Sequence, residues 1–145
     1  MPPTANRQLQ PVKMGRTARL IKTPDARAFD KELELYKKNG SFRFKKHHID
    51  YLHEVLNQNP LSGLVVNCYF VFPKSKVISK ANTIKKLDAN NRLKSTLDAV
   101  SYLTEIDDSR FFTGICEKVI CNKTISPYVI VTMEWTELRL SLIHI

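Results

Sequence analysis

The stretch LVVNCYFVF, residues 64–72, sets the strongest limit on the fold. It is rich in β-branched and aromatic residues, and apolar residues occupy both its odd and its even positions. Because successive side chains of a strand point to opposite faces, such a segment is expected to be buried on both. The sequence therefore predicts a central strand of a sheet, with other elements packed around it.

Two helices are predicted before this strand. Thr23-Pro24-Asp25 combines a capping hydroxyl, a proline at the first helical position and an acid in the first turn, and Asn39-Gly40 ends that helix. A second helix is expected from Lys45 to Gln58, before Asn59-Pro60. Its apolar face is formed by Ile49, Leu52 and Leu56.

A third helix and two further strands are predicted after it. The helix runs from about Ala89 to Tyr102, and its core face is marked by Leu93, Leu97 and Val100. Strands are expected around 115–121 and at 128–135, the latter with Val129, Val131, Met133 and Trp135 on one side. We therefore expect an α/β (α+β) fold with one mixed sheet flanked by helices.

The length of 145 residues suits a single domain, 1–145. Residues 1–22 are interpreted as a basic strand or arm with a loop, and residues 73–87 as a basic loop. The apolar tail 140–145 fits either a strand covered by a partner or an artefact of the sequence used.

The formal net charge of +9 indicates a polyanionic partner, of which nucleic acid is the commonest, although a solvated basic surface gives the same value. The three cysteines, Cys68, Cys116 and Cys121, form no CxxC pair, so buried free thiols are expected rather than a zinc site or a disulfide. With no long apolar run and no signal-peptide pattern at the start, we expect a cytosolic protein without a membrane partner.

The stretch 85–112 holds the candidate chemistry. Asp88 lies at the start of the third helix, and Asn91, Lys94 and Asp98 follow at steps of three and four, so these three share a helix face away from the core. Asp107 and Asp108 follow the helix, and pairing of the next strand beside the central strand could bring them near Asp88. Carboxylates framed by lysines suit Mg²⁺ and a phosphate.

Each of these residues also has a purely structural interpretation. Asp88 fits an N-cap, Lys94 and Asp98 fit an exposed ion pair, and Asp107-Asp108-Ser109 fits a turn. Spacing alone does not separate these interpretations from the catalytic one.

The motifs in this stretch resemble the RusA family of Holliday junction resolvases. Asp88-Ala89-Asn90-Asn91-Arg92-Leu93-Lys94, Asp98 further along, and the double acid Asp107-Asp108 follow the family pattern in order. Pro2-Pro3-Thr4-Ala5-Asn6-Arg7 is similar to the opening of the family, and a basic loop containing glycine follows it. The resemblance extends from about residue 2 to residue 135.

The resemblance implies a set of residue roles. Asp88 and Asp108 would bind Mg²⁺ or Mn²⁺, Asp107 would assist them, Lys94 would support the phosphate, and Asn91 and Asp98 would be auxiliary. It also implies paired hydrolysis of a four-way DNA junction by a two-fold homodimer, in the cytosol of a bacterium or of a phage-infected host. The residues expected to grip DNA are Asn6, Arg7, Lys13, Arg16, Arg19, Lys74, Lys76, Lys80, Lys85 and Lys86.

One position departs from the family pattern. Asn90 stands where the second aspartate is expected, and its uncharged amide holds Mg²⁺ less well than a carboxylate. Either the residue is an engineered change, or the protein is a divergent member that binds junctions without cutting them. In both cases we expect weak or no nuclease activity from this sequence.

Other functions fit parts of the sequence less well. A non-catalytic binder of branched or duplex DNA shares the same basic residues and is favoured by Asn90. An RNA-associated protein is disfavoured, because no RNA-recognition motif is present. His47, His48 and His53 lack the spacing of helical metal pairs, and we expect them on the surface or facing DNA.

Overall fold

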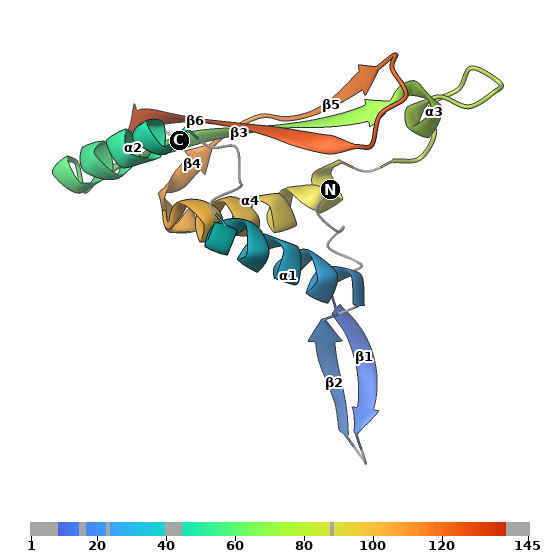
Figure 1. The fold of residues 1–145 in the computed structure, drawn as a ribbon, viewed down its shortest axis with the longest axis horizontal. Helices are drawn as coiled ribbons and strands as arrows, with labels where there is room; N and C mark the ends of the chain where they lie inside the picture. Colours follow the sequence, from blue (N-terminus) through green and yellow to red (C-terminus); the bar gives the residue numbers. More distant parts are fainter. Residues whose placement is uncertain (1–8, 15–16, 23, 40–44, 88, 139–145) are drawn as a thin grey trace, which may run out of the picture.

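A computed structural model describes residues 9–14, 17–22, 24–39, 45–87 and 89–138. The strands are β1 (Leu9–Met14), β2 (Thr17–Lys22), β3 (Ser62–Pro73), β4 (Phe111–Thr113), β5 (Cys116–Cys121) and β6 (Tyr128–Glu137) (Figure 1). The helices are α1 (Pro24–Asn39), α2 (Lys46–Gln58), α3 (Lys74–Val77), α4 (Asn90–Thr104) and the short 3-10 helix η2 (Asp108–Arg110). Helices and strands mix along the chain, and the predicted α+β content is confirmed.

Strand β3 is the centre of a four-stranded mixed sheet. β6 pairs with it antiparallel from Ser62 to Val71, whereas β4 and β5 pair with it parallel. Because β6 occupies one edge of β3 over nearly its full length, β4 and β5 share the other edge. The prediction of a central strand is confirmed.

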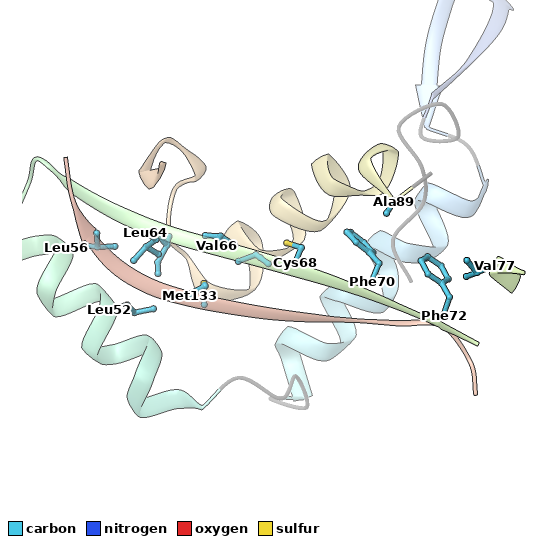
Figure 2. Close-up of a cluster of buried hydrophobic side chains, with 12 residues drawn as sticks. Leu52, Leu56, Leu64, Val66, Cys68, Phe70, Phe72, Val77, Ala89 and Met133 are labelled. Carbon is cyan, nitrogen blue, oxygen red and sulfur yellow. The ribbon is translucent and has the colours of Figure 1, made fainter. Parts of the chain in front are cut away.

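Alternate side chains of β3 supply most of the core (Figure 2). Leu64, Cys68 and Phe70 are fully buried, together with residues from α2, α4 and β6. On the opposite face Val65 and Tyr69 are only half-buried, so the prediction of full burial on both faces is wrong. The reason is that α2 and α4 both contribute to the core on the same face of the sheet.

The three long helices have the bounds that their capping and apolar patterns predict, within two residues. α4 crosses beneath the sheet, α1 lies beside α4, and α2 lies along β6 (Figure 1). The predicted apolar face of α2 is confirmed, because Ile49, Leu52 and Leu56 are its buried residues. None of the helices in the described ranges has the length and apolar character needed to cross a membrane.

The buried face of α4 differs from the predicted stripe. Val100 is buried, but Leu93 and Leu97 are half-buried at the margin of the core. The buried positions are mainly small or hydroxyl-bearing residues: Ser95, Thr96, Ala99, Val100 and Thr104. The hydroxyls of Thr96 and Thr104 donate to backbone carbonyls one turn earlier in the helix. Because these polar groups are hydrogen-bonded, burying them costs little free energy. A search for apolar residues at helical spacing does not detect such a face, because most of its residues are small or bear hydroxyl groups.

The two basic segments, within 1–22 and at 73–87, contain more regular secondary structure than expected. Residues 9–22 form a separate antiparallel hairpin of β1 and β2 rather than a single strand. Within 73–87, Pro73 ends β3, Lys74–Val77 form the helical turn α3, and an isolated bridge joins Ile78 and Ile84. The tail 140–145 lies outside the described residues.

The cysteines are free, and only Cys68 is fully buried, while Cys116 and Cys121 are half-buried. Burial, with a smaller contribution from neighbouring Cys116, raises the pKa of the Cys68 thiol to about 11. A thiol with so high a pKa is a weak nucleophile at neutral pH.

Gly114 separates β4 from β5 and permits a close contact with β3. A Cβ at this position would collide with the carbonyl group of Val66. In this connection between β4 and β5, the backbone of Ile115 bonds to β3. Its N–H donates to Asn67 Oδ1 (2.9 Å), and its carbonyl accepts from Cys68 N (2.8 Å). The approach of this connection to β3 fixes where β4 ends and β5 begins.

We expect Gly114→Ala to destabilise the fold by more than about 2 kcal/mol, because the obstacle is backbone that cannot rotate away. Thr113→Ala, at the exposed neighbouring position, is the matched control and should cost less than about 0.5 kcal/mol. Urea unfolding followed by circular dichroism measures both. Equal stability of the two variants would contradict the close contact.

Candidate active site

Helix α4 displays the first half of the predicted site at its N-terminal end. Ala89 is 8% exposed and anchors this end in the core, and its carbonyl accepts from Arg92 N (3.0 Å). Asn90 begins the helix and is exposed. Asp88 lies outside the described residues, so its place is known only as the position that precedes Ala89.

The polar face of α4 agrees with the sequence prediction. Lys94 and Asp98 are exposed and Asn91 is half-buried, on the side away from buried Thr96 and Val100. Lys94 lies one turn after Asn90, so its flexible ammonium can reach an anion held at the start of the helix. This arrangement suits the role predicted for Lys94.

The double acid forms the second half of the predicted site, in the turn between α4 and β4. Asp107 and Asp108 are both exposed. Asp107 Oδ1 accepts from Ser109 N (2.9 Å) and caps the 3-10 helix η2, and hydrogen bonding by Ser109 lowers the pKa of this carboxyl. Asp107 therefore has the structural role of a turn cap, whatever else it does.

Within one chain the two halves lie at opposite ends of α4 (Figure 1). The helix has 15 residues, and at 1.5 Å per residue it spans about 20 Å. The approach of the acids was conditional on a strand after α4 pairing beside β3. The strand that directly follows the acids is β4, which was not predicted, and it joins β3 near the N-terminal end of β3, at Leu64↔Phe111. The expected approach of Asp107 and Asp108 to the Asp88 end of α4 is therefore not found within a single chain.

The candidate metal ligands that the structure describes do not lie together. Among the described residues, which leave out Asp88, no group of three or more His, Cys, Asp or Glu side chains could hold a metal ion. Asn90 offers one amide oxygen at one end of α4, and the exposed carboxylates of Asp107 and Asp108 are at the other. Within the described part of one chain, these oxygen ligands for Mg²⁺ are therefore separated by the length of α4.

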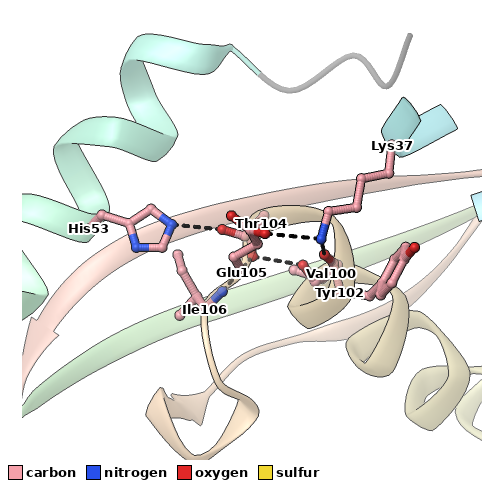
Figure 3. A network of polar contacts seen from close by, with 7 residues as sticks. All are labelled: Lys37, His53, Val100, Tyr102, Thr104, Glu105 and Ile106. Atoms are coloured by element: carbon pink, nitrogen blue, oxygen red, sulfur yellow. Dashed lines mark hydrogen bonds and ion pairs between the residues drawn. The ribbon is translucent and has the colours of Figure 1, made fainter. Parts of the chain in front are cut away.

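The C-terminal end of α4 is fixed by contacts from α1 and α2 (Figure 3). Lys37 Nζ lies 3.1 Å from the Glu105 carboxylate, donates to Tyr102 O (3.2 Å) and lies 4.5 Å from the Tyr102 ring centroid. His53 Nε2 donates to Thr104 O (2.7 Å), and Ser101 Oγ donates to Ile106 O (2.7 Å). These contacts hold the turn that carries Asp107 and Asp108.

His48 and His53 contribute to the scaffold. His53 Nε2 donates to Thr104 O, and His48 Nε2 donates to Met133 O (2.9 Å) on β6. Both side chains are half-buried, so the surface or DNA-facing placement predicted for them is wrong, whereas His47 is exposed as predicted. The paired His47-His48 pattern gives no sign of this, because the partner carbonyls lie far away in the sequence.

Arg110 is the positioning residue that sequence reasoning missed. Its Nε donates to Ser62 O (2.7 Å), and its Nη2 donates to Leu56 O (3.2 Å) and Asn59 O (3.1 Å). It therefore ties the acid-bearing turn to the end of α2 and the start of β3. The sequence signal for this role was the position of Arg110, two residues after the pair Asp107-Asp108.

The predicted DNA-binding residues fall into two groups. Lys74, Lys76, Lys80, Lys85 and Lys86 are exposed around α3 and the segment that leads to α4. Lys13 lies in β1 and Arg19 in β2, opposite Ala18 and Val12 respectively. Asn6, Arg7 and Arg16 lie outside the described residues.

Exposed carboxylates and lysines on an α+β scaffold with a net charge of +9 are the groups that a metal-assisted nuclease of DNA requires. The comparisons with known proteins agree with this class. The chain belongs to the RusA endodeoxyribonuclease family, whose model, described as Endodeoxyribonuclease RusA, matches residues 1–134. No curated protein and no solved structure gives a significant match.

Family membership implies endodeoxyribonuclease activity, Holliday junction resolution and binding of branched DNA. Nucleases of this type generally depend on a divalent metal. The family assignment thus confirms the resemblance that the central and N-terminal motifs carry. The individual site residues remain predictions.

We expect Arg110→Leu to destabilise the protein by about 2 kcal/mol, because three carbonyl oxygens lose a charged donor. Arg110→Lys keeps the charge but cannot bridge the same carbonyls, and it should fall between the leucine variant and the wild type. Urea unfolding provides the measurement. A loss below about 0.5 kcal/mol for the leucine variant would show that Arg110 does not hold the turn.

Proposed function

We propose that this protein acts on four-way DNA junctions as a two-fold homodimer of the resolvase type, and that Asn90 weakens its cleavage step. The observation that carries the proposal is the separation of Asn90 from Asp107 and Asp108 by the length of α4. A second chain related by a two-fold axis perpendicular to α4 has its own α4 running in the opposite direction. The acid-bearing turn of one copy can then meet the Asp88 end of the other.

In this arrangement Asp88, Asn90, Asp107 and Asp108 form the metal-binding set, drawn from two copies. Mg²⁺, or Mn²⁺, would polarise the phosphodiester when bound. Lys94 holds a phosphate oxygen and stabilises the charge that develops on it, while Asn91 and Asp98 orient the groups around it. Two such sites, one on each side of the axis, match the two strands to be nicked in a junction.

DNA binding in the proposal rests on the charge balance of the chain. The lysines around α3 are exposed and lie at the end of the sheet from which the chain enters α4 (Figure 1). With Lys13, Arg19 and the basic residues outside the described ranges, they would neutralise backbone phosphates. Affinity for DNA should therefore fall steeply with salt.

The alternative is a non-catalytic protein that recognises branched or duplex DNA. Asn90 favours it, since the residue is exposed at the start of α4 and brings no negative charge to the metal-binding set. Both functions share the same basic residues. They differ in whether a carboxylate at position 90 restores cleavage.

We expect Asn90→Asp to raise the rate of symmetric nicking of a labelled four-way junction in Mg²⁺ or Mn²⁺ by at least about tenfold, because even groups around metal ligands affect activity by that much. Asn57→Asp adds the same charge at an exposed position of α2 and should leave the rate unchanged. Chelation of the metal should abolish the gain. Tight junction binding without cutting by either protein would leave the non-catalytic function standing, and absence of both would reject the proposal.

A mixing experiment tests whether two copies share one site. In the Asn90→Asp background, one chain also carries Asp88→Asn and the other Asp108→Asn, so neither homodimer has a complete set. If the site is shared, a mixed dimer contains one complete set and one doubly impaired set, and it should nick one strand of the junction. If each chain forms its own site, no mixture should cut.

A further inference from the structure

We propose that a basic hollow at the carboxyl edge of the sheet binds backbone phosphates of a DNA arm, with Lys123 as a principal contact. The hollow, of about 590 Å³, is distinct from the acid-bearing ends of α4. Its ligand rests on the proposed function, since the phosphates are those of the DNA substrate. Its lining residues are Pro73, Lys74, Ser75, Ile78, Ser79, Lys80, Asn82, Lys85, Asn122, Lys123 and Thr124.

The sheet topology creates this hollow. β3 and β5 are adjacent and parallel, and Pro73 lies opposite Cys121 at their carboxyl ends. α3 follows β3, and residues 122–124 follow β5. These two segments therefore leave the sheet side by side. In open sheets with parallel strands, the carboxyl edge is where ligands commonly bind.

The charge of the lining selects an anion. Among the described residues, the lining of the hollow contains four lysines and no carboxylate. Lys85 Nζ donates to Ser75 O (2.7 Å) and so supports the wall. Lys74, Lys80 and Lys123 are exposed and form no ion pair with a carboxylate in the described ranges, which leaves their ammonium groups available.

One wall is shaped before any ligand binds. Ser79 N donates to Thr83 O (2.8 Å), Asn82 N donates to Ser79 O (3.0 Å), and Lys85 N donates to Val77 O (2.7 Å). Asn82 adopts a left-handed conformation at the tip, with φ of 58°, which asparagine tolerates well. Because the turn is already ordered, binding does not have to order it.

The polar groups favour phosphate over an acidic protein segment. Hydroxyl and amide side chains, Ser75, Ser79, Asn122 and Thr124 among them, lie between the lysines and can donate to phosphate oxygens. In the part of the lining that the structure describes, Pro73 and Ile78 are the apolar side chains, which is little surface for a protein side chain to pack against. The segment 78–87 leads from the hollow to α4. A DNA strand whose phosphates are held in the hollow would therefore continue toward Lys94.

The test measures binding of the full-length protein to a labelled four-way junction and to a labelled duplex by fluorescence anisotropy, across a range of salt and with chelator present so that no cleavage occurs. Lys123→Gln should weaken both affinities roughly three- to tenfold at moderate salt. It should also reduce the magnitude of the log–log salt slope by about 0.9 for each phosphate that the protein no longer neutralises. Lys123→Arg, which keeps the charge, should stay near the wild type.

Lys31→Gln is the matched control, because it removes the same charge from an exposed position of α1. If Lys123→Gln binds DNA as Lys31→Gln does, with the same salt slope, the subsite is rejected even though the wild-type protein binds junctions. If Lys123→Gln abolishes thermal stabilisation by a mononucleotide but leaves DNA affinity unchanged, the hollow binds a free phosphate ester and the DNA subsite is also rejected. If the wild-type protein binds no DNA at all, both the subsite and the proposed function are rejected.

Discussion

The parallel pairing of β3 with β4 and β5 governs the rest of this structure. Parallel neighbours cannot be joined by a tight turn, so the chain has to cross the length of the sheet between them. Helix α4 makes that crossing, and its core face is built from small and hydroxyl-bearing residues that pack on β3. The polar motif of the family is thereby divided, with Asn90 at one end of the crossing and Asp107 and Asp108 at the other.

The same crossing explains why the acid-bearing turn is anchored so firmly. Lys37 and His53 bond to residues at the end of α4, and Arg110, in the turn that follows, donates to backbone carbonyls at the end of α2 and the start of β3. They come from α1, α2 and the turn itself, so three parts of the chain fix one short segment. If a second copy supplies the other half of the site, this rigidity sets the position of its carboxylates.

Asn90 separates two properties that are usually joined in a nuclease. Binding of DNA depends on the lysines and arginines of the chain, whose excess over acids is unaffected by an amide at position 90. Cleavage depends on a metal-binding set, which loses one negative charge there. The proposed function therefore gives the chain a stronger role in recognising a junction than in cutting it, and it assigns the basic hollow around Lys123 to recognition.

The sequence alone determined the three long helices, the central strand and the family. Proline and asparagine signals bounded α1, apolar spacing gave the buried face of α2, and the run at 64–72 marked the central strand. The motif from Asp88 to Lys94 with the later double acid indicated the RusA family, which the family model over residues 1–134 confirms. These features depend on near neighbours in the chain, so local spacing carries them.

Only the tertiary structure decided which residues meet. The register of β3 with β4 placed the acids at the far end of α4, and the register of β3 with β5 brought Lys123 beside Lys74. The carbonyl partners of His48, His53 and Arg110 are 48 to 85 residues away in the sequence. A tight turn fixes the register of the two strands that it joins, but β4 and β5 follow β3 only after the long crossover through α4. Their register with β3 therefore depends on how the crossover packs against the sheet.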